Sequence, residues 1–254
     1  MKDDGNDEQT SGTKADGGQS LSWDLYVDPD RHIEFSPRIL ARVRKDISAD
    51  RTKSLEDYLQ QMLSSYREFR AALKLYEISR DMMQVAVPAR TAARWQGEWS
   101  LPYWPVWNDW QHLAAKQGAV SVRNFGQAMT AAQALAGSEK ALLELLDPRI
   151  GGRAIGRFKQ SFPGIDQLRH AVVHPEYYPN PKKKGTSING GIPEAINAAP
   201  GATVEFTGLV RDKYTITFDG EVQQCDISGA TELILKEILE EYFSMFEPAA
   251  AFTK

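Results

Sequence analysis

Two histidines and an arginine stand close together in the stretch LRHAVVHPE, residues 168–176. Arg169 carries a permanent charge on a planar fork that suits phosphate oxygens. His174 titrates near neutral pH and is suited to act as a general acid or base. Pro175, directly after His174, predicts that a helix ends there. The stretch therefore indicates a metal-binding pair, an acid/base site or the basic end of an ordinary helix.

The metal interpretation has the least support. His170 and His174 are four residues apart, a spacing that places two imidazoles on one helix face. Zinc peptidases with this spacing need a glutamate directly after the first histidine, and here that residue is Ala171. The other histidines, His32 and His112, are far away in the sequence. We expect no metal and no other cofactor.

Three further patterns carry less chemistry. The glycine-rich stretch at 151–156 lacks the Gly-Lys-Ser/Thr ending of a phosphate-binding loop, so we expect a helix break there. Residues 95–110 hold five of the six tryptophans and are predicted to form an aromatic loop, which packs on the core or serves as a stacking platform. Cys225 falls in a strand pattern and is interpreted as structural.

Helical patterns fill the first two thirds of the chain. A short helix is predicted over 36–47, and a long one over 54–86 begins at Ser54 as its N-cap and is ended by Pro88. Further helices are expected at 109–117, 121–136 and 138–146, with glycines near the breaks. Residues 151–175 predict one more helix, or two segments broken at Pro163.

The composition of the sequence changes after His174. A long polar loop is expected over 175–201, followed by strands at 203–210, 213–220 and 221–227, with Asp219 and Gly220 as a hairpin turn. Ser228 is predicted to cap a final amphipathic helix. The expected fold class is mainly α: a helical bundle with a small C-terminal antiparallel β-meander and a final helix.

This pattern predicts three regions. Residues 1–20 form a disordered acidic tail with a net charge of −3, out of −4 for the whole chain. Residues 21–176 form the helical bundle, and residues 177–254 pack on it as part of one globular unit. The nearly neutral remainder lacks the basic footprint of a tight nonspecific nucleic-acid binder. No apolar run reaches the roughly 20 residues of a membrane span, the N-terminus has no signal-peptide pattern, and the single cysteine favours a cytoplasmic location.

Arg169 and His174 fit the pattern of an arginine and a histidine separated by four to six residues, here four. With its helical context the chain resembles the HEPN superfamily, all-α domains of which many members are metal-independent endoribonucleases. The motif covers about nine residues, and the architecture covers residues 55–176. The chain departs from the family at His170, where the residue after the arginine is commonly polar and most often asparagine.

The resemblance implies a HEPN-like bundle that works as a homodimer with a composite site and takes RNA as its substrate. His174 would be the acid/base for attack by the RNA 2′-hydroxyl, and Arg169 would stabilise the phosphorane. His170 and Glu176 would support the pair. Family members that act as toxins or defence effectors suggest an inhibitory protein partner. The run Lys182, Lys183 and Lys184 is either a solvated loop or a set of phosphate contacts.

Two alternatives stay open beside the nuclease. One is a non-catalytic helical protein-interaction module, whose surface is the tryptophan loop and the meander. The other is a small-molecule or nucleotide site under the tryptophan loop. Geometry bears on the choice, because residues five apart on an ideal helix are separated by about 140° and about 7.5 Å. Arg169 and His174 therefore converge only if the helix ends near His174, or if two chains pool their pairs.

Overall fold

The computed structural model describes residues 47–95, 104–166, 207–210, 212–218 and 221–246. Contacts divide the chain into two units, Met1–Glu34 and Phe35–Lys254, and every described residue belongs to the second. The predicted acidic tail at 1–20, all but the last residue of the predicted helix 36–47 and the polar loop at 175–201 lie outside the described residues.

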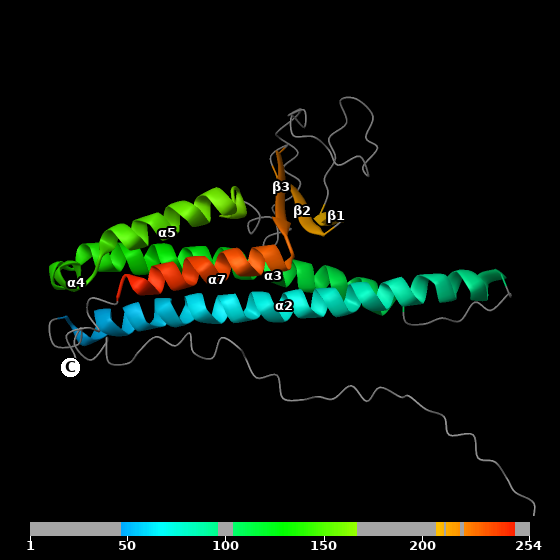
Figure 1. The fold of residues 1–254 in the computed structure, drawn as a ribbon, viewed down its shortest axis with the longest axis horizontal. Helices are drawn as coiled ribbons and strands as arrows, with labels where there is room; N and C mark the ends of the chain where they lie inside the picture. The colour runs from blue at the N-terminus through cyan, green and yellow to red at the C-terminus, as the bar shows by residue number, and fades with distance from the viewer. Residues whose placement is uncertain (1–46, 96–103, 167–206, 211, 219–220, 247–254) are drawn as a thin grey trace, which may run out of the picture. The chain divides into compact units, whose positions relative to one another are not determined.

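The described part is mainly helical and carries a small antiparallel sheet before its last helix (Figure 1). Its helices are α2 (Ala49–Trp95), α3 (Trp104–Ser138), α4 (Lys140–Leu145), α5 (Pro148–Ser161) and α7 (Gly229–Ser244). Its strands are β1 (Thr207–Val210), β2 (Lys213–Phe218) and β3 (Glu221–Asp226). The predicted class, mainly α with a C-terminal meander and a final helix, is confirmed.

The core lies where α2 packs along α3 and where α7 packs against α2 and α5 (Figure 1). Apolar side chains at three- and four-residue steps form the buried face of each helix, as the periodicity of the sequence predicts. The largest fully buried ones are Leu55, Leu59, Met62, Tyr66, Phe69 and Tyr76 on α2, Phe125 and Met129 on α3, and Tyr242 on α7. Each buried side chain of this size contributes about 1.5–3 kcal/mol.

The predicted ends of the second helix are wrong. α2 begins at Ala49, and the Ser54 hydroxyl lies inside the helix, where it donates to the Asp50 carbonyl at 2.9 Å. At the other end α2 continues through Pro88 to Trp95. A proline inside a helix removes one backbone donor and crowds one turn, at a cost of about 3 kcal/mol. The buried face of a 47-residue helix outweighs that local cost.

α3 is one helix of 35 residues that takes in the two predicted at 109–117 and 121–136, whereas the one predicted at 138–146 corresponds to α4. α3 begins at Trp104, so residues 104–110 of the predicted aromatic loop are helical. Gly118 does not break it. A Cβ at Gly118 would lie 3.1 Å from Ile227 Cδ1 and 3.6 Å from Phe69 Cε2, so this glycine allows close packing. Glycine costs a helix about 1 kcal/mol, and the close packing offsets it.

The sheet has the predicted meander order β1-β2-β3. Phe218 on β2 is paired with Glu221 on β3, which fits the predicted two-residue turn at 219–220, residues that lie outside the described part. The Tyr76 hydroxyl of α2 donates to Asp212 Oδ1 at 2.9 Å and ties the sheet to the helices. Burial, together with this carboxylate, raises the pKa of Tyr76 to about 12. The Ser228 cap is confirmed, since its Oγ accepts from the Thr231 amide.

α5 contains the glycine-rich stretch 151–156, so the expected helix break there is wrong. The Asp147 side chain caps its start by accepting from the Arg149 amide at 3.1 Å, and Pro148 follows at the first helical position. Gly151 is buried against Gln133 of α3 and Met245 beyond α7, where a side chain would not fit. This helix thus lies against both α3 and α7.

Within the described residues, none of the helices combines the length and the apolar character needed to cross a membrane.

Candidate functional site

The residues that sequence analysis singled out lie beyond the described part of the chain. Arg169, His170, His174 and Glu176, together with Lys182, Lys183 and Lys184, all fall within 167–206. The last described residue before this segment is Asp166, three residues before Arg169. The site is therefore built from what surrounds that entry point.

A turn after α5 sets the direction of the entering chain. α5 ends at Ser161, and the Phe162 amide donates to the Phe158 carbonyl at 2.9 Å. Pro163 cannot continue the hydrogen-bond ladder, so the predicted break at this residue is confirmed. Gly164 follows with φ 73°, a left-handed conformation that favours glycine.

Gly164 also lies against the sheet. A Cβ at this position would meet the amide end of the Gln223 side chain of β3, which would have to move. The turn after α5 and the meander are therefore in direct contact. This contact places one edge of the meander beside the chain that leads to Arg169.

An ion pair holds the last described residue before that segment. The Arg123 Nε of α3 lies 3.8 Å from the Asp166 Oδ1. The Arg123 side chain is only 9% exposed, whereas that of Asp166 is 80% exposed. A largely buried guanidinium keeps its charge, because its pKa lies far above neutrality. Arg123 thus supplies a fixed positive charge next to the entry of the predicted motif.

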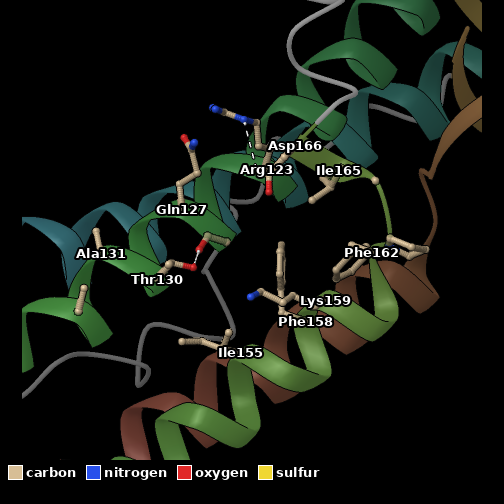
Figure 2. A pocket seen from close by; sticks show the side chains of 14 residues that line it. Arg123, Gln127, Thr130, Ala131, Ile155, Phe158, Lys159, Phe162, Ile165 and Asp166 are labelled. Carbon is tan, nitrogen blue, oxygen red and sulfur yellow. Dashed lines mark hydrogen bonds and ion pairs between the residues drawn. The ribbon is translucent and has the colours of Figure 1, made fainter. Parts of the chain in front are cut away.

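A groove of about 860 Å³ lies between α3 and α5 and ends at Asp166. Figure 2 shows Phe158 and Lys159 projecting from α5 toward α3, with Thr130 on the facing helix and Phe162 at the end of α5. The α3 wall is one helical stripe with steps of three and four residues: Arg123, Gln127, Thr130, Ala131 and Ala134. The groove is thus mainly apolar with polar groups along one edge.

The helices approach closely at the groove floor because of Gly126. A Cβ at Gly126 would collide with the Phe158 ring, so the glycine lets this ring lie directly on α3. Phe158 stacks on Phe125 of α3 with centroids 5.9 Å apart. It also contacts Phe162, with centroids 5.1 Å apart at an interplanar angle of 49°. The aromatic pair Phe158–Phe162 forms one wall of the groove.

The charges around the groove do not cancel. Arg123 and Lys159 are cationic, and Asp166 is the one acidic residue among those that line it. Lys159 is exposed and makes no ion pair with any residue that the structure describes. The lining therefore carries a net charge of +1 and offers an ammonium group to an anion.

The other reactive side chains of the described part are poorly placed for chemistry. Burial, with the Asp226 carboxylate adding to it, raises the pKa of the Cys225 thiol to about 12, which leaves it unreactive near neutral pH. His112 lies on α3 and is the one histidine among the described residues. Nowhere in the described ranges do three or more His, Cys, Asp or Glu side chains gather as a metal would need.

The tryptophan-rich region is more exposed than a purely structural interpretation predicts. Trp107 and Trp110 form an edge-to-face pair on α3 with centroids 5.4 Å apart. Trp110 is 45% exposed and lies in one helical stripe with Val106 and Leu113, which are 42% and 61% exposed. This end of α3 thus presents an apolar stripe.

The groove residues were not among those predicted from the sequence. The signal for them was present in the stretch Arg157-Phe158-Lys159 with Phe162 three residues later, where basic and aromatic residues alternate. No protein-family model matches the chain, and the comparisons with curated proteins and with solved structures found no match either.

Proposed function

We propose that the chain is a metal-independent endoribonuclease of HEPN type. In this proposal His174 acts as acid/base toward the RNA 2′-hydroxyl and the leaving 5′-oxygen, and Arg169 stabilises the charge of the phosphorane. His170 and Glu176 orient this pair, and Lys182, Lys183 and Lys184 hold phosphates of the strand. The mainly helical fold with a C-terminal meander is in keeping with the resemblance that suggests this function.

One observation supports the proposal most directly. Asp166 is held by Arg123 at the end of a groove whose lining has a positive net charge. Arg169 comes three residues later, and three residues of fully extended chain span at most about 11 Å. The backbone of Arg169 therefore lies within about 11 Å of Asp166, whatever the conformation between them. The cleft at Asp166, three residues before Arg169 in the sequence, has the charge and the aromatic side chains that suit a polyanionic substrate with aromatic bases.

The test is cleavage of a mixed RNA substrate in EDTA. We expect the wild-type chain to cleave, and Arg169→Ala or His174→Ala to lower the rate by about 10²- to 10⁴-fold. Arg149→Ala, at an exposed position on α5, and His112→Ala on α3 are the matched controls and retain the wild-type rate. Absence of cleavage by the wild type, or equal rates for all four variants, would contradict the proposal.

The proposal includes a homodimer whose site draws on both copies. Arg169→Ala and His174→Ala chains are each inactive in this scheme, and mixing them restores part of the activity if one copy supplies the arginine and the other the histidine. A mixture as inactive as its components would place each pair within one chain. An inhibitory protein partner belongs to the same proposal, because uncontrolled RNA cleavage harms the cell that makes the enzyme.

A second candidate function is a non-catalytic protein-interaction module. The exposed stripe Val106, Trp110 and Leu113 favours it, because contiguous exposed apolar side chains mark interaction surfaces. This candidate predicts no RNA cleavage at all. It also predicts that Trp110→Glu with Leu113→Glu changes the molar mass measured by light scattering, whereas Leu143→Glu on α4, another exposed apolar residue, does not.

A further inference from the structure

The groove between α3 and α5 has the dimensions of a ligand site. Its volume of about 860 Å³ lies within the roughly 300–1,000 Å³ typical of small-molecule and cofactor sites. Such sites are mainly apolar and carry a few polar groups that fix the orientation of the ligand. Here the apolar groups include Phe158, Phe162 and Ile155, and the polar groups lie along α3 and at Lys159 (Figure 2).

The aromatic wall indicates a flat ligand group. Phe162 lines the groove, is partly exposed and is tilted by 49° against Phe158, so part of its ring is open to a ligand. Aromatic side chains stack nucleobases with little sequence preference, because every base has a π-face. The Thr130 hydroxyl donates to the Gly126 carbonyl at 2.8 Å, which leaves its lone pairs able to accept from a base.

The charge pattern indicates that the flat group is attached to an anion. Lys159 extends from α5 into the space between the helices, one residue after Phe158 (Figure 2). Arg123 on the opposite helix is offset by its ion pair with Asp166, so Lys159 supplies the net positive charge of this space. A cation beside an aromatic wall matches a phosphate joined to a base, and a purely apolar ligand would gain nothing from the exposed ammonium group of Lys159.

We propose that this groove binds one nucleotide of a single-stranded RNA, with the base on the partly exposed Phe162 ring, which the buried Phe158 supports, and the phosphate at Lys159. This inference rests on the proposed function, since the nucleotide belongs to the strand that Arg169 and His174 cleave. The groove then fixes where the strand is cut, because it holds a base within a short chain distance of the motif. Charge alone would admit RNA or an acidic peptide, and the aromatic wall favours RNA because each of its nucleotides joins an anion to a base that stacks.

The experiment measures binding of a 2′-O-methyl RNA oligonucleotide by fluorescence anisotropy. This probe lacks the hydroxyl nucleophile, so binding is observed without cleavage. We expect Lys159→Glu to weaken binding by roughly tenfold at low salt and to flatten its salt dependence. Lys116→Glu reverses the charge of an exposed α3 lysine that does not line the groove, and we expect it to change binding less than twofold.

A second pair of variants tests the stacking wall. We expect Phe162→Leu to weaken binding by roughly tenfold and Phe162→Tyr to restore it, while the melting temperature of both stays near that of the wild type. In the cleavage assay, Lys159→Glu and Phe162→Leu are expected to raise KM more than they lower kcat, since both act on binding.

The outcomes separate this inference from the proposed function. Cleavage and oligonucleotide binding that are unchanged in Lys159→Glu and Phe162→Leu would overturn the groove as an RNA site and leave the nuclease standing. A wild-type chain that neither binds nor cleaves RNA would overturn both. Binding of free uridine or adenosine monophosphate as tight as that of the oligonucleotide would also overturn the inference, because the groove would then be a mononucleotide site.

Discussion

α5 packs against two helices in different ways. Toward α7 its arginines are matched by carboxylates: Arg153 Nε lies 3.2 Å from Glu241 Oε1, and Arg157 pairs with Glu237 and Glu241. Toward α3 it leaves an open groove in which Lys159 makes no ion pair with the described residues. On the side facing α7, the arginines of α5 are paired with carboxylates of the fold. On the side facing α3, a positive charge remains near the partly exposed Phe162 ring. The difference separates a seam that stabilises the fold from a surface suited to a ligand.

The largest effect expected from this comparison is at the groove floor. Phe158 is 5% exposed and lies on Gly126 and Phe125, so we expect Phe158→Ala to cost about 3–5 kcal/mol of the free energy of unfolding. Phe162→Ala removes a partly exposed ring and should cost roughly 1 kcal/mol. Urea unfolding followed by circular dichroism measures both. Equal losses would mean that the Phe162 ring belongs to the closed core.

Alanine substitutions at two glycines, Gly126 and Gly152, are expected to change the free energy of unfolding in opposite directions. Gly126→Ala places a methyl group against the Phe158 ring and is expected to cost about 1–3 kcal/mol, because the helices must move apart. Gly152→Ala lies on the exposed side of α5 with open space around its Cβ, and is expected to stabilise by about 0.5–1 kcal/mol. Thermal unfolding of the two variants measures the difference. Stabilisation by Gly126→Ala would show that α3 and α5 are not in close contact there.

These glycines also mark the limit of what the sequence predicts. Gly118 and the stretch from Gly151 were interpreted as helix breaks, because glycine weakens a helix when it is judged locally. In the fold Gly118 and Gly151 lie where another element approaches closely, whereas Gly152 and Gly156 have open space around them and are simply accommodated within α5. The apolar spacing from Ala115 and Ala119 through Val122 runs across Gly118 without a phase change, and this continuity was the available signal for one helix.

Elements defined by local chemistry were predicted well. The alternation in β2 and β3, the Ser228 cap and the break at Pro163 depend on neighbouring residues only, and each was confirmed. The groove depends instead on residues about 30 positions apart, such as Gly126 and Phe158, meeting across two helices. No local pattern predicts that meeting, so the groove between α3 and α5 could not be predicted from the sequence, whereas the motif at Arg169 is a local pattern and stays a prediction.

The hydrogen bond that ties the meander to α2 is expected to have an effect of intermediate size on the free energy of unfolding. The meander contacts Gly164 through Gln223 and is tied to α2 by the hydrogen bond from Tyr76 to Asp212. We expect Tyr76→Phe to cost about 1 kcal/mol at neutral pH. The pKa of Tyr76 is raised from 10.0 to about 12 in the folded chain, so its contribution is present below pH 10 and is lost as the pH rises from 10 to 12. Urea unfolding between pH 8 and 12 should show a steeper loss for wild type than for Tyr76→Phe.

The smallest expected effect tests the comparison itself. Glu241 accepts from Arg153 and lies 4.0 Å from Arg157, so Glu241→Gln weakens two ion pairs of the α5–α7 seam. Such partly exposed pairs contribute about 0.2–1 kcal/mol, and the loss should disappear near 1 M salt, where the Debye length is about 3 Å.

Lys159→Gln removes a charge of the same helix that pairs with no described residue, and should leave the free energy of unfolding within about 0.5 kcal/mol of wild type. Urea unfolding at low and high salt, with oligonucleotide binding measured in parallel, distinguishes the two. Glu241→Gln should change stability and not binding, and Lys159→Gln should change binding and not stability. If Lys159→Gln destabilised the fold in a salt-dependent way, its ammonium group would have a partner within the chain, and the groove side of α5 would be a second structural seam.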